Sequence, residues 1–225
     1  MKTIYAVGDL HGEFAKLREI CRRIATEAAG RTGEKLGVFL GDYIDRGPDS
    51  RPVVELLMTG NALPFPYICL MGNHEEFALD GKLRGLWISE KNGGAATLAS
   101  FGGEIPPEVK AWLSSLPLSH RDGSWLFVHA GVNPFVTLSD QPREAMLWSR
   151  YAYDGPYPEG VTVVHGHTPG NEVEIGPHRI NLDTGACFGG NLSCAILTDK
   201  LEGFLYVGGP KRYRHQPGFA ALIQE

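Results

Sequence analysis

The stretch LGVFLGDYIDRGPDS, residues 36–50, begins with a short apolar run, continues with a glycine and charged residues, and ends at the expected start of a helix. The apolar run at 36–40 has the length of a buried strand, and apolar positions recur at helical spacing after Ser50. The same order of strand, polar loop and helix occurs twice more, with strands at 4–7 and 67–71. Such repeats predict an α/β fold whose strands end in polar loops.

The pattern changes after residue 119, where short strands and turns replace the helices. A helix is expected at 106–116, with proline in its first turn, and 81–103 is expected to be a loop-rich insertion with one short helix. Helix-separated strands followed by hairpins predict an α/β fold with two mixed sheets face to face and helices outside, a four-layer αββα sandwich. The strands expected in the second half are 125–128, 162–164, 179–182, 193–197 and 204–207.

The composition suits one globular domain, 1–225, with a sizeable core, since 43% of the residues are hydrophobic and 21% are charged. The net charge is −5 and the lysines and arginines are scattered, which argues against nucleic acid as a partner. The sequence shows neither a membrane span nor a secretory leader, so we expect a cytoplasmic protein with no membrane partner. The four cysteines form no CxxC pair and are expected to be buried thiols.

Side chains that can bind a metal ion follow five of the expected strands. Asp9 and His11 lie two residues apart after the first strand, and both can point the same way if the chain stays extended there. Asp42 follows the second strand, and parallel pairing would bring its carboxylate beside the first two residues, where it can bridge two cations. Later strands are followed by three further candidate ligands, Asn73, His129 and His167.

Each of these residues alone would have a structural explanation. An aspartate before glycine usually makes a turn, and a histidine after a strand is more often part of the core. Turn formation does not require histidine and aspartate at the ends of five strands, however. Their recurrence therefore predicts a dinuclear metal site. Mixed imidazole, amide and carboxylate ligands suit manganese, iron, zinc or cobalt.

With these motifs the sequence resembles the phosphoprotein phosphatases, a family within the calcineurin-like metallophosphoesterases. The matching motifs are GDLHG (8–12), GDYIDRG (41–47), GNHE (72–75), HAG (129–131) and HGHTP (165–169), in the family's order over nearly the whole chain. The segments LWSR (147–150) and DTGA (183–186) look like those of small bacterial and phage members. The resemblance implies two divalent ions, manganese the first choice, one held by Asp9, His11 and Asp42 and the other by Asp42, Asn73, His129 and His167.

The remaining roles follow from the chemistry of phosphate ester hydrolysis. Two cations about 4 Å apart lower the pKa of a bridging water, so water is the expected nucleophile. An alkyl alcohol is a poor leaving group and needs a proton donor, for which His74 beside Asn73 is the candidate. Asp45 is expected to orient His74 and keep it protonated. Arg46 and Arg150 are the candidate cations for the phosphate oxygens.

The leading interpretation is a protein serine/threonine phosphatase that also accepts phosphotyrosine. The alternative is a dinucleoside polyphosphate (diadenosine tetraphosphate) hydrolase. By resemblance, members with that activity tend to lack the aspartate that stands here as Asp45. A non-catalytic phosphate-binding module would have eroded ligands, and none of the six is missing. Neither the physiological substrate nor the oligomeric state can be inferred from the sequence, and specificity is expected to depend on 81–103 and on the loop after Arg150.

Overall fold

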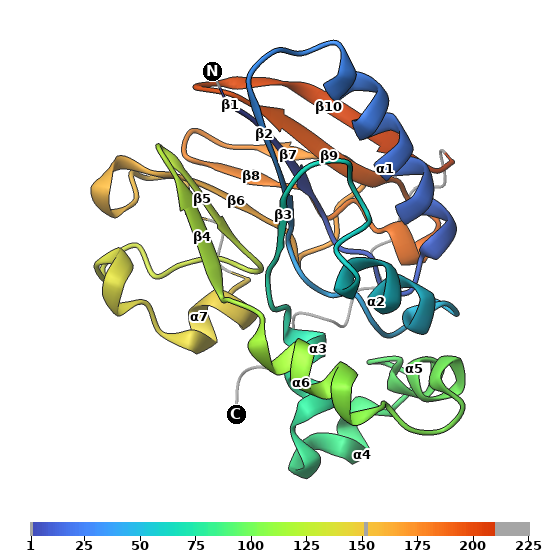
Figure 1. Cartoon of the computed structure of the whole chain (residues 1–225). Coiled ribbons are helices and arrows are strands. Elements are labelled where there is room, and N and C mark those ends of the chain that lie inside the picture. The colour runs from blue at the N-terminus through green and yellow to red at the C-terminus, as the bar shows by residue number, and fades with distance from the viewer. Residues whose placement is uncertain (1, 151–152, 210–225) are drawn as a thin grey trace.

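The computed structural model describes residues 2–150 and 153–209, in which two five-stranded sheets pack face to face (Figure 1). From edge to edge, the first sheet contains β10 (Leu201–Val207), β9 (Leu192–Leu197), β1 (Lys2–Val7), β2 (Glu34–Phe39) and β3 (Tyr67–Cys69). The second contains β4 (Ser119–Asp122), β5 (Trp125–Val128), β6 (Thr162–His165), β8 (Arg179–Asn181) and β7 (Glu174–Ile175). Both sheets mix parallel and antiparallel pairs, so the prediction of two mixed sheets is confirmed.

Helices flank the sheets and cluster at one end of the molecule (Figure 1). They are α1 (Phe14–Ala29), α2 (Ser50–Met58), α3 (Asn73–Leu79), α4 (Arg84–Trp87), α5 (Gly94–Phe101), α6 (Pro107–Ser115) and α7 (Arg143–Trp148). Single 3₁₀ turns occur at Gly81–Leu83, Leu138–Asp140, Pro158–Gly160 and Ala186–Phe188. Within the described ranges, no helix is long and apolar enough to cross a membrane.

Strand β1 shows how the apolar residues divide between layers. Its residues alternate in direction, so Tyr5 and Val7 join the core beneath the helices while Ile4 and Ala6 join the core between the two sheets. A strand buried on both faces reads as a continuous apolar run, which is why the sequence identified it. A third apolar cluster, which includes Val128, covers the outer face of the second sheet.

The insertion 81–103 is more helical than the sequence predicted. It contains a 3₁₀ turn and two helices, α4 and α5, instead of one short helix in a loop. The glycines that indicated a loop are the caps of α5: Gly93 and Gly102 flank the helix with φ of 81° and 79°, a conformation that favours glycine. Between them the segment is rich in alanine, the strongest helix former.

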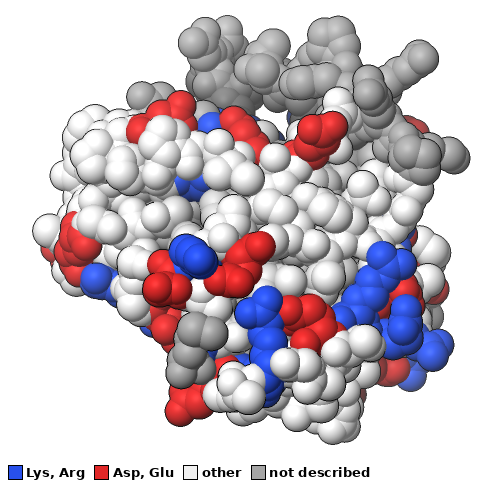
Figure 2. Space-filling model, turned by 90° about the horizontal axis from the view of Figure 1, so that it is seen from above, with Lys and Arg blue, Asp and Glu red and all other residues white. Residues whose placement is uncertain are grey.

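The surface charges alternate in sign. Figure 2 shows lysine and arginine beside aspartate and glutamate on the face seen from above, without a broad basic surface among the described residues of that face. On α1, for example, Glu19 pairs with both Arg22 and Arg23. Exposed pairs of this kind contribute little to stability.

Candidate dimetal active site

Four buried side chains from the ends of different strands converge on one point. His129 Nε2, after β5, lies 2.8 Å from Asn73 Oδ1 and 3.2 Å from His167 Nδ1. His167, after β6, places its Nδ1 2.8 Å from the same Asn73 oxygen. Asp42, after β2, places Oδ1 3.4 Å from His129 Nε2. The structure thus brings together the four residues expected to hold the second metal ion.

The chemistry of these atoms fits a cation. His129 Nδ1 lies 2.9 Å from the carbonyl oxygen of Leu40, which can only accept, so Nδ1 carries the hydrogen. Burial lowers the pKa of His129 to about 4, so the ring is neutral and Nε2 presents a lone pair. That lone pair faces the carboxylate of Asp42 and the Asn73 amide oxygen, which are acceptors too. Two features here are typical of a metal site: several acceptor atoms face one another, and the other ring nitrogen of the histidine donates to a backbone carbonyl.

Asp42 lies between two groups of donors, as its expected bridging role requires. Its second oxygen, Oδ2, lies 3.3 Å from His11 Nε2, so one carboxylate oxygen faces His11 and the other faces His129. His11 Nδ1 lies 2.9 Å from the Ile44 carbonyl, which again leaves Nε2 as the lone-pair nitrogen. Among the described residues, two sets of three donors lie within 4.8 Å of one another: His11, Asp42 and His74, and Asp42, His129 and His167.

Asp9 reaches the site by a different route from the one expected. The chain is not extended at His11, whose φ of 42° is left-handed, so the condition under which the two side chains were expected to point the same way is not met. Asp9 instead accepts hydrogen bonds at 3.0 and 3.3 Å from the backbone N–H of His167, which follows a strand of the other sheet. Asp9 belongs to neither tight donor set, yet burial and then the charges of Asp183 and Asp42 raise its pKa.

Two acidic residues lie in motifs of the sequence but received no role there. Glu75 is buried and accepts three backbone hydrogen bonds of 2.8 Å, from Asp42, Tyr43 and Gly72, so it ties the loop after β2 to the loop after β3. Asp183, after β8, is buried close enough to raise the pKa of Asp9. Glu75 and Asp183 each follow a strand, as the predicted ligands do, and this position is the feature of the sequence that could have identified them as site residues.

His74 and Asp45 form a buried pair, with Nδ1 and Oδ2 2.6 Å apart. This contact provides the orientation expected from the sequence, whereas burial acts against the expected protonation of the imidazole. Burial, followed by the positive charge of Arg46, lowers the pKa of His74, and burial raises the pKa of Asp45 to about 8. A protonated carboxyl beside a neutral imidazole holds as many protons as a carboxylate beside an imidazolium, so the pair retains one proton to release at neutral pH.

The two expected arginines lie at the mouth of the site. Arg46 is half-buried, contacts His11 Nε2 through Nη1, and lies over the Phe188 ring at 5.4 Å. Arg150 is exposed, and partial burial followed by repulsion from Arg46 lowers the pKa of its guanidinium. Two guanidinium groups close enough to repel each other favour an anion with several oxygens between them.

The buried carboxyls of Asp42 and Asp45 are expected to make the metal-free protein less stable as the pH rises from about 4 to about 8, the range between their pKa values in the unfolded and the folded chain. The folded chain holds protons on Asp42 and Asp45, whose pKa values burial raises to about 7 and about 8, whereas the unfolded chain has lost both protons near pH 4. Unfolding therefore releases protons, and each one lowers the free energy of unfolding by about 1.4 kcal/mol per pH unit. The buried histidines oppose this loss below about pH 6.5, where they are charged only in the unfolded chain, so the loss is expected to be clearest between about pH 6.5 and pH 8.

Thermal unfolding in the presence of a chelator, at several pH values in this window, measures the effect. Asp45→Asn should flatten the decline, since it removes one of the titrating groups. A melting temperature that rises from about pH 6.5 to pH 8 would contradict the assignment of protons to these two carboxyls.

Two sets of possible metal donors at the meeting point of two sheets, with arginines beside them, are typical of the binuclear metal-dependent phosphoesterases. The profile of the calcineurin-like phosphoesterases matches residues 2–209, and the chain belongs to this family. The family uses a dimetal centre, in agreement with the convergent donors.

Relatives within the family carry different activities in their names. The symmetrical bis(5'-nucleosyl)-tetraphosphatase of Methylococcus capsulatus is 33% identical over 132 residues, which cover 59% of this chain and 44% of that protein. The chain thus spans less than half of that relative. Serine/threonine-protein phosphatase 1 of Salmonella typhimurium is 29% identical over 86% of this chain and 91% of its own length. A solved structure provisionally described as a diadenosine tetraphosphatase covers 92% of this chain and 93% of its own, with a TM-score of 0.67 and 27% identity.

Proposed function

We propose that this chain is a phosphatase for monoesters of alkyl alcohols, with phosphoserine and phosphothreonine in proteins as its main substrates and phosphotyrosine as an additional one. The observation that carries the proposal is the 2.6 Å contact between His74 and Asp45. An alkoxide is a poor leaving group and needs a proton as it departs, whereas a phosphate leaving group needs it less. A buried proton-holding pair beside the metal positions is suited to the harder reaction.

The metal-binding residues would be those that the sequence predicted. They are Asp9, His11 and Asp42 for one ion and Asp42, Asn73, His129 and His167 for the other, with manganese the first choice and iron, zinc or cobalt also suited. When bound, two such ions supply an acidified water and neutralise the phosphate oxygens.

The chain's own residues would perform the other steps. Arg46 and Arg150 bind the phosphate oxygens and hold the ester in place. His74 releases a proton from Nε2 to the departing alkoxide, and Asp45 fixes the ring at Nδ1 and replaces the lost proton. Glu75 holds the loops that carry Asp42 and His74 at their observed separation through its three backbone hydrogen bonds.

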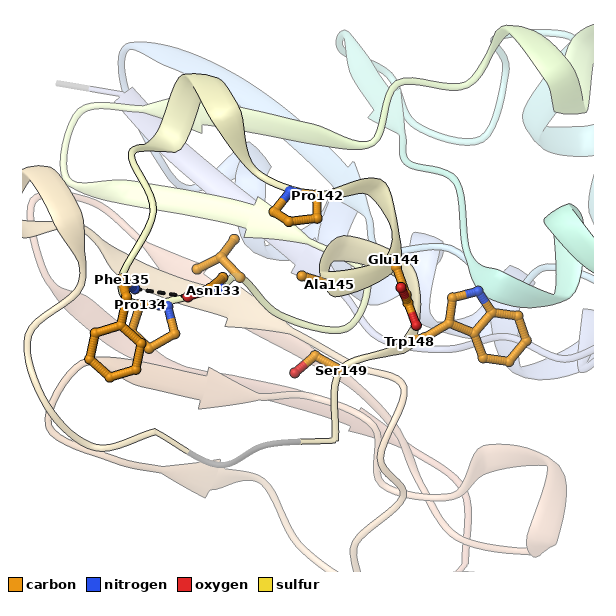
Figure 3. A pocket seen from close by; sticks show the side chains of 9 residues that line it. Asn133, Pro134, Phe135, Pro142, Glu144, Ala145, Trp148 and Ser149 are labelled. Atoms are coloured by element: carbon orange, nitrogen blue, oxygen red, sulfur yellow. Dashed lines mark hydrogen bonds between the residues drawn. The ribbon is translucent and has the colours of Figure 1, made fainter. Parts of the chain in front are cut away.

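Hydrolysis of dinucleoside polyphosphates is a second candidate function. It is favoured by the names of the relatives and by a cavity of about 450 Å³ beside the site (Figure 3). The ring of Trp148, which lines the cavity, lies 6.3 Å from the ring of His167. At the far side Phe135 is 82% exposed, so the cavity has aromatic side chains at both ends. Such walls suit a nucleobase, and they also suit an apolar side chain of a phosphopeptide.

A comparison of two substrates tests the proposal. We expect the purified protein, loaded with manganese, to have a kcat/KM on a phosphoserine peptide at least about tenfold above that on diadenosine tetraphosphate. The reverse order would favour the second function, and Phe135→Ala would then weaken hydrolysis of the dinucleotide more than that of a phosphoserine peptide without apolar side chains. Ile175→Ala is the matched control, because Ile175 is also an exposed apolar side chain but lies on β7, outside the cavity.

A further inference from the structure

The carboxylate of Asp45 is held by two side chains from the insertion 81–103. Trp87 donates its indole N–H to both oxygens, at 2.8 Å to Oδ2 and 3.0 Å to Oδ1. Thr97 donates its hydroxyl to Oδ1 at 2.6 Å. His74 takes up the remaining contact, at Oδ2. Asp45 has no exposed surface, so these three partners determine where its carboxylate points.

Trp87 is unlike its neighbours on the chain. Leu86 and Ile88 are 52% and 39% exposed, whereas Trp87 is 2% exposed. The short helix α4 therefore turns one large side chain inward, and that side chain ends on the carboxylate. Gly94 makes room for it, since a Cβ at this position would lie 2.6 Å from the indole ring. An apolar contact alone would need no N–H aimed at Asp45.

The insertion also holds the backbone of the same loop. The N–H of Asp45 donates to the Thr97 hydroxyl at 2.8 Å, and the N–H of Arg46 donates to the Gly93 carbonyl at 3.3 Å. Asp45 and Arg46 have φ of 75° and 66°, which is unfavourable for residues other than glycine and persists only where the surroundings enforce it. Thr97 thus fixes both the main chain and the side chain of Asp45.

We propose that Trp87 and Thr97 are positioning residues, which aim the Asp45 carboxylate at Nδ1 of His74 and thereby set the rate at which a poor leaving group is protonated. The inference rests on the proposed role of His74. It assigns the insertion 81–103 a positioning role, whereas the sequence predicted that this segment determines substrate specificity. A specificity surface would change KM among substrates, whereas a positioning element changes kcat according to the leaving group.

Trp87→Phe removes the indole N–H that contacts both Asp45 oxygens, together with part of the ring. Thr97→Val keeps the shape of the side chain and removes both hydrogen bonds that the hydroxyl makes with Asp45. We expect kcat on benzyl phosphate, an alkyl monoester, to fall on the order of tenfold to hundredfold, part of the roughly 10²- to 10⁴-fold that general acid catalysis contributes. The fall on 4-nitrophenyl phosphate, whose leaving group needs no proton, should be less than about threefold. Thr97→Ser keeps the hydroxyl and should restore most of the rate.

Trp125→Phe is the matched control, because Trp125 is a buried tryptophan of β5 whose N–H is bonded to the Thr198 carbonyl, away from Asp45. It should affect the two esters alike. Equal losses on both esters in Trp87→Phe and Thr97→Val, or no loss, would overturn the positioning role.

His74→Asn in the same assay separates the proposed acid role of His74 from the positioning role of Trp87 and Thr97. If it spares benzyl phosphate, the proposed acid is wrong and the positioning role falls with it. If His74→Asn slows benzyl phosphate selectively but Trp87→Phe and Thr97→Val do not, only the positioning role is wrong. Should Trp87→Phe not fold, the Thr97 pair decides.

Discussion

Replacement of Asp42 by asparagine is expected to lower kcat/KM by on the order of 10³-fold or more on every phosphate ester. Asp42 places one oxygen 3.3 Å from His11 Nε2 and the other 3.4 Å from His129 Nε2, so it belongs to both donor sets. The amide keeps the shape but loses the charge and one acceptor. Because Asp42→Asn acts on metal binding and not on proton transfer to the leaving group, 4-nitrophenyl phosphate and benzyl phosphate should be affected equally. Manganese affinity should fall in parallel.

The fold itself should survive the change. Burial, and to a smaller extent the negative charge of Asp183, raises the pKa of Asp42, so a neutral side chain is easier to bury in the metal-free protein. We expect an unchanged or higher melting temperature in the presence of a chelator. Asp199→Asn, on the exposed turn between β9 and β10, is the matched control and should retain full activity. Wild-type turnover in Asp42→Asn would refute the dimetal assignment.

Replacement of His74 by asparagine is expected to act according to the leaving group. On benzyl phosphate kcat should fall by roughly 10² to 10⁴, the usual contribution of general acid catalysis, while 4-nitrophenyl phosphate should lose less than about tenfold. Asp45→Asn should show the same selectivity, since its carboxylate acts through the 2.6 Å contact with His74. The double variant should be little worse than either single one, because the two residues act as a unit.

Steady-state kinetics on the two esters provides the measurement. His178→Asn is the matched control, because His178 lies in the turn before β8 and has no part in the proposed chemistry. An equal loss on both esters in His74→Asn would point to metal binding or to folding instead of acid catalysis. Additive losses in the double variant would contradict the coupling of His74 and Asp45.

Sequence reasoning succeeded where burial made the pattern simple. β1 is buried on both faces and reads as an apolar run. β4 was missed, because its residues Ser119–Asp122 are polar and alternate between exposed and half-buried. The insertion 81–103 was expected to hold one short helix and holds two, because the capping glycines of α5, Gly93 and Gly102, resemble those of turns.

The candidate site divides in a similar way. The convergence of Asp42 with His11 and His129 could be predicted, since parallel strands end at one edge and their loops meet there. The support of Asp45 could not. Trp87 and Thr97 lie 42 and 52 residues along the chain from it, in a segment with no motif. Contacts of this kind depend on how the insertion docks, which local pattern does not encode.

The central claim is that activity depends on two metal ions held by these residues. It is tested most directly by titrating chelated protein with manganese while measuring both the ions bound per chain and the rate of benzyl phosphate hydrolysis. We predict no activity in the chelated protein, two ions bound at saturation, and a rate that becomes maximal only when the second ion binds. Full activity in the chelated protein, or with a single ion per chain, would contradict the account.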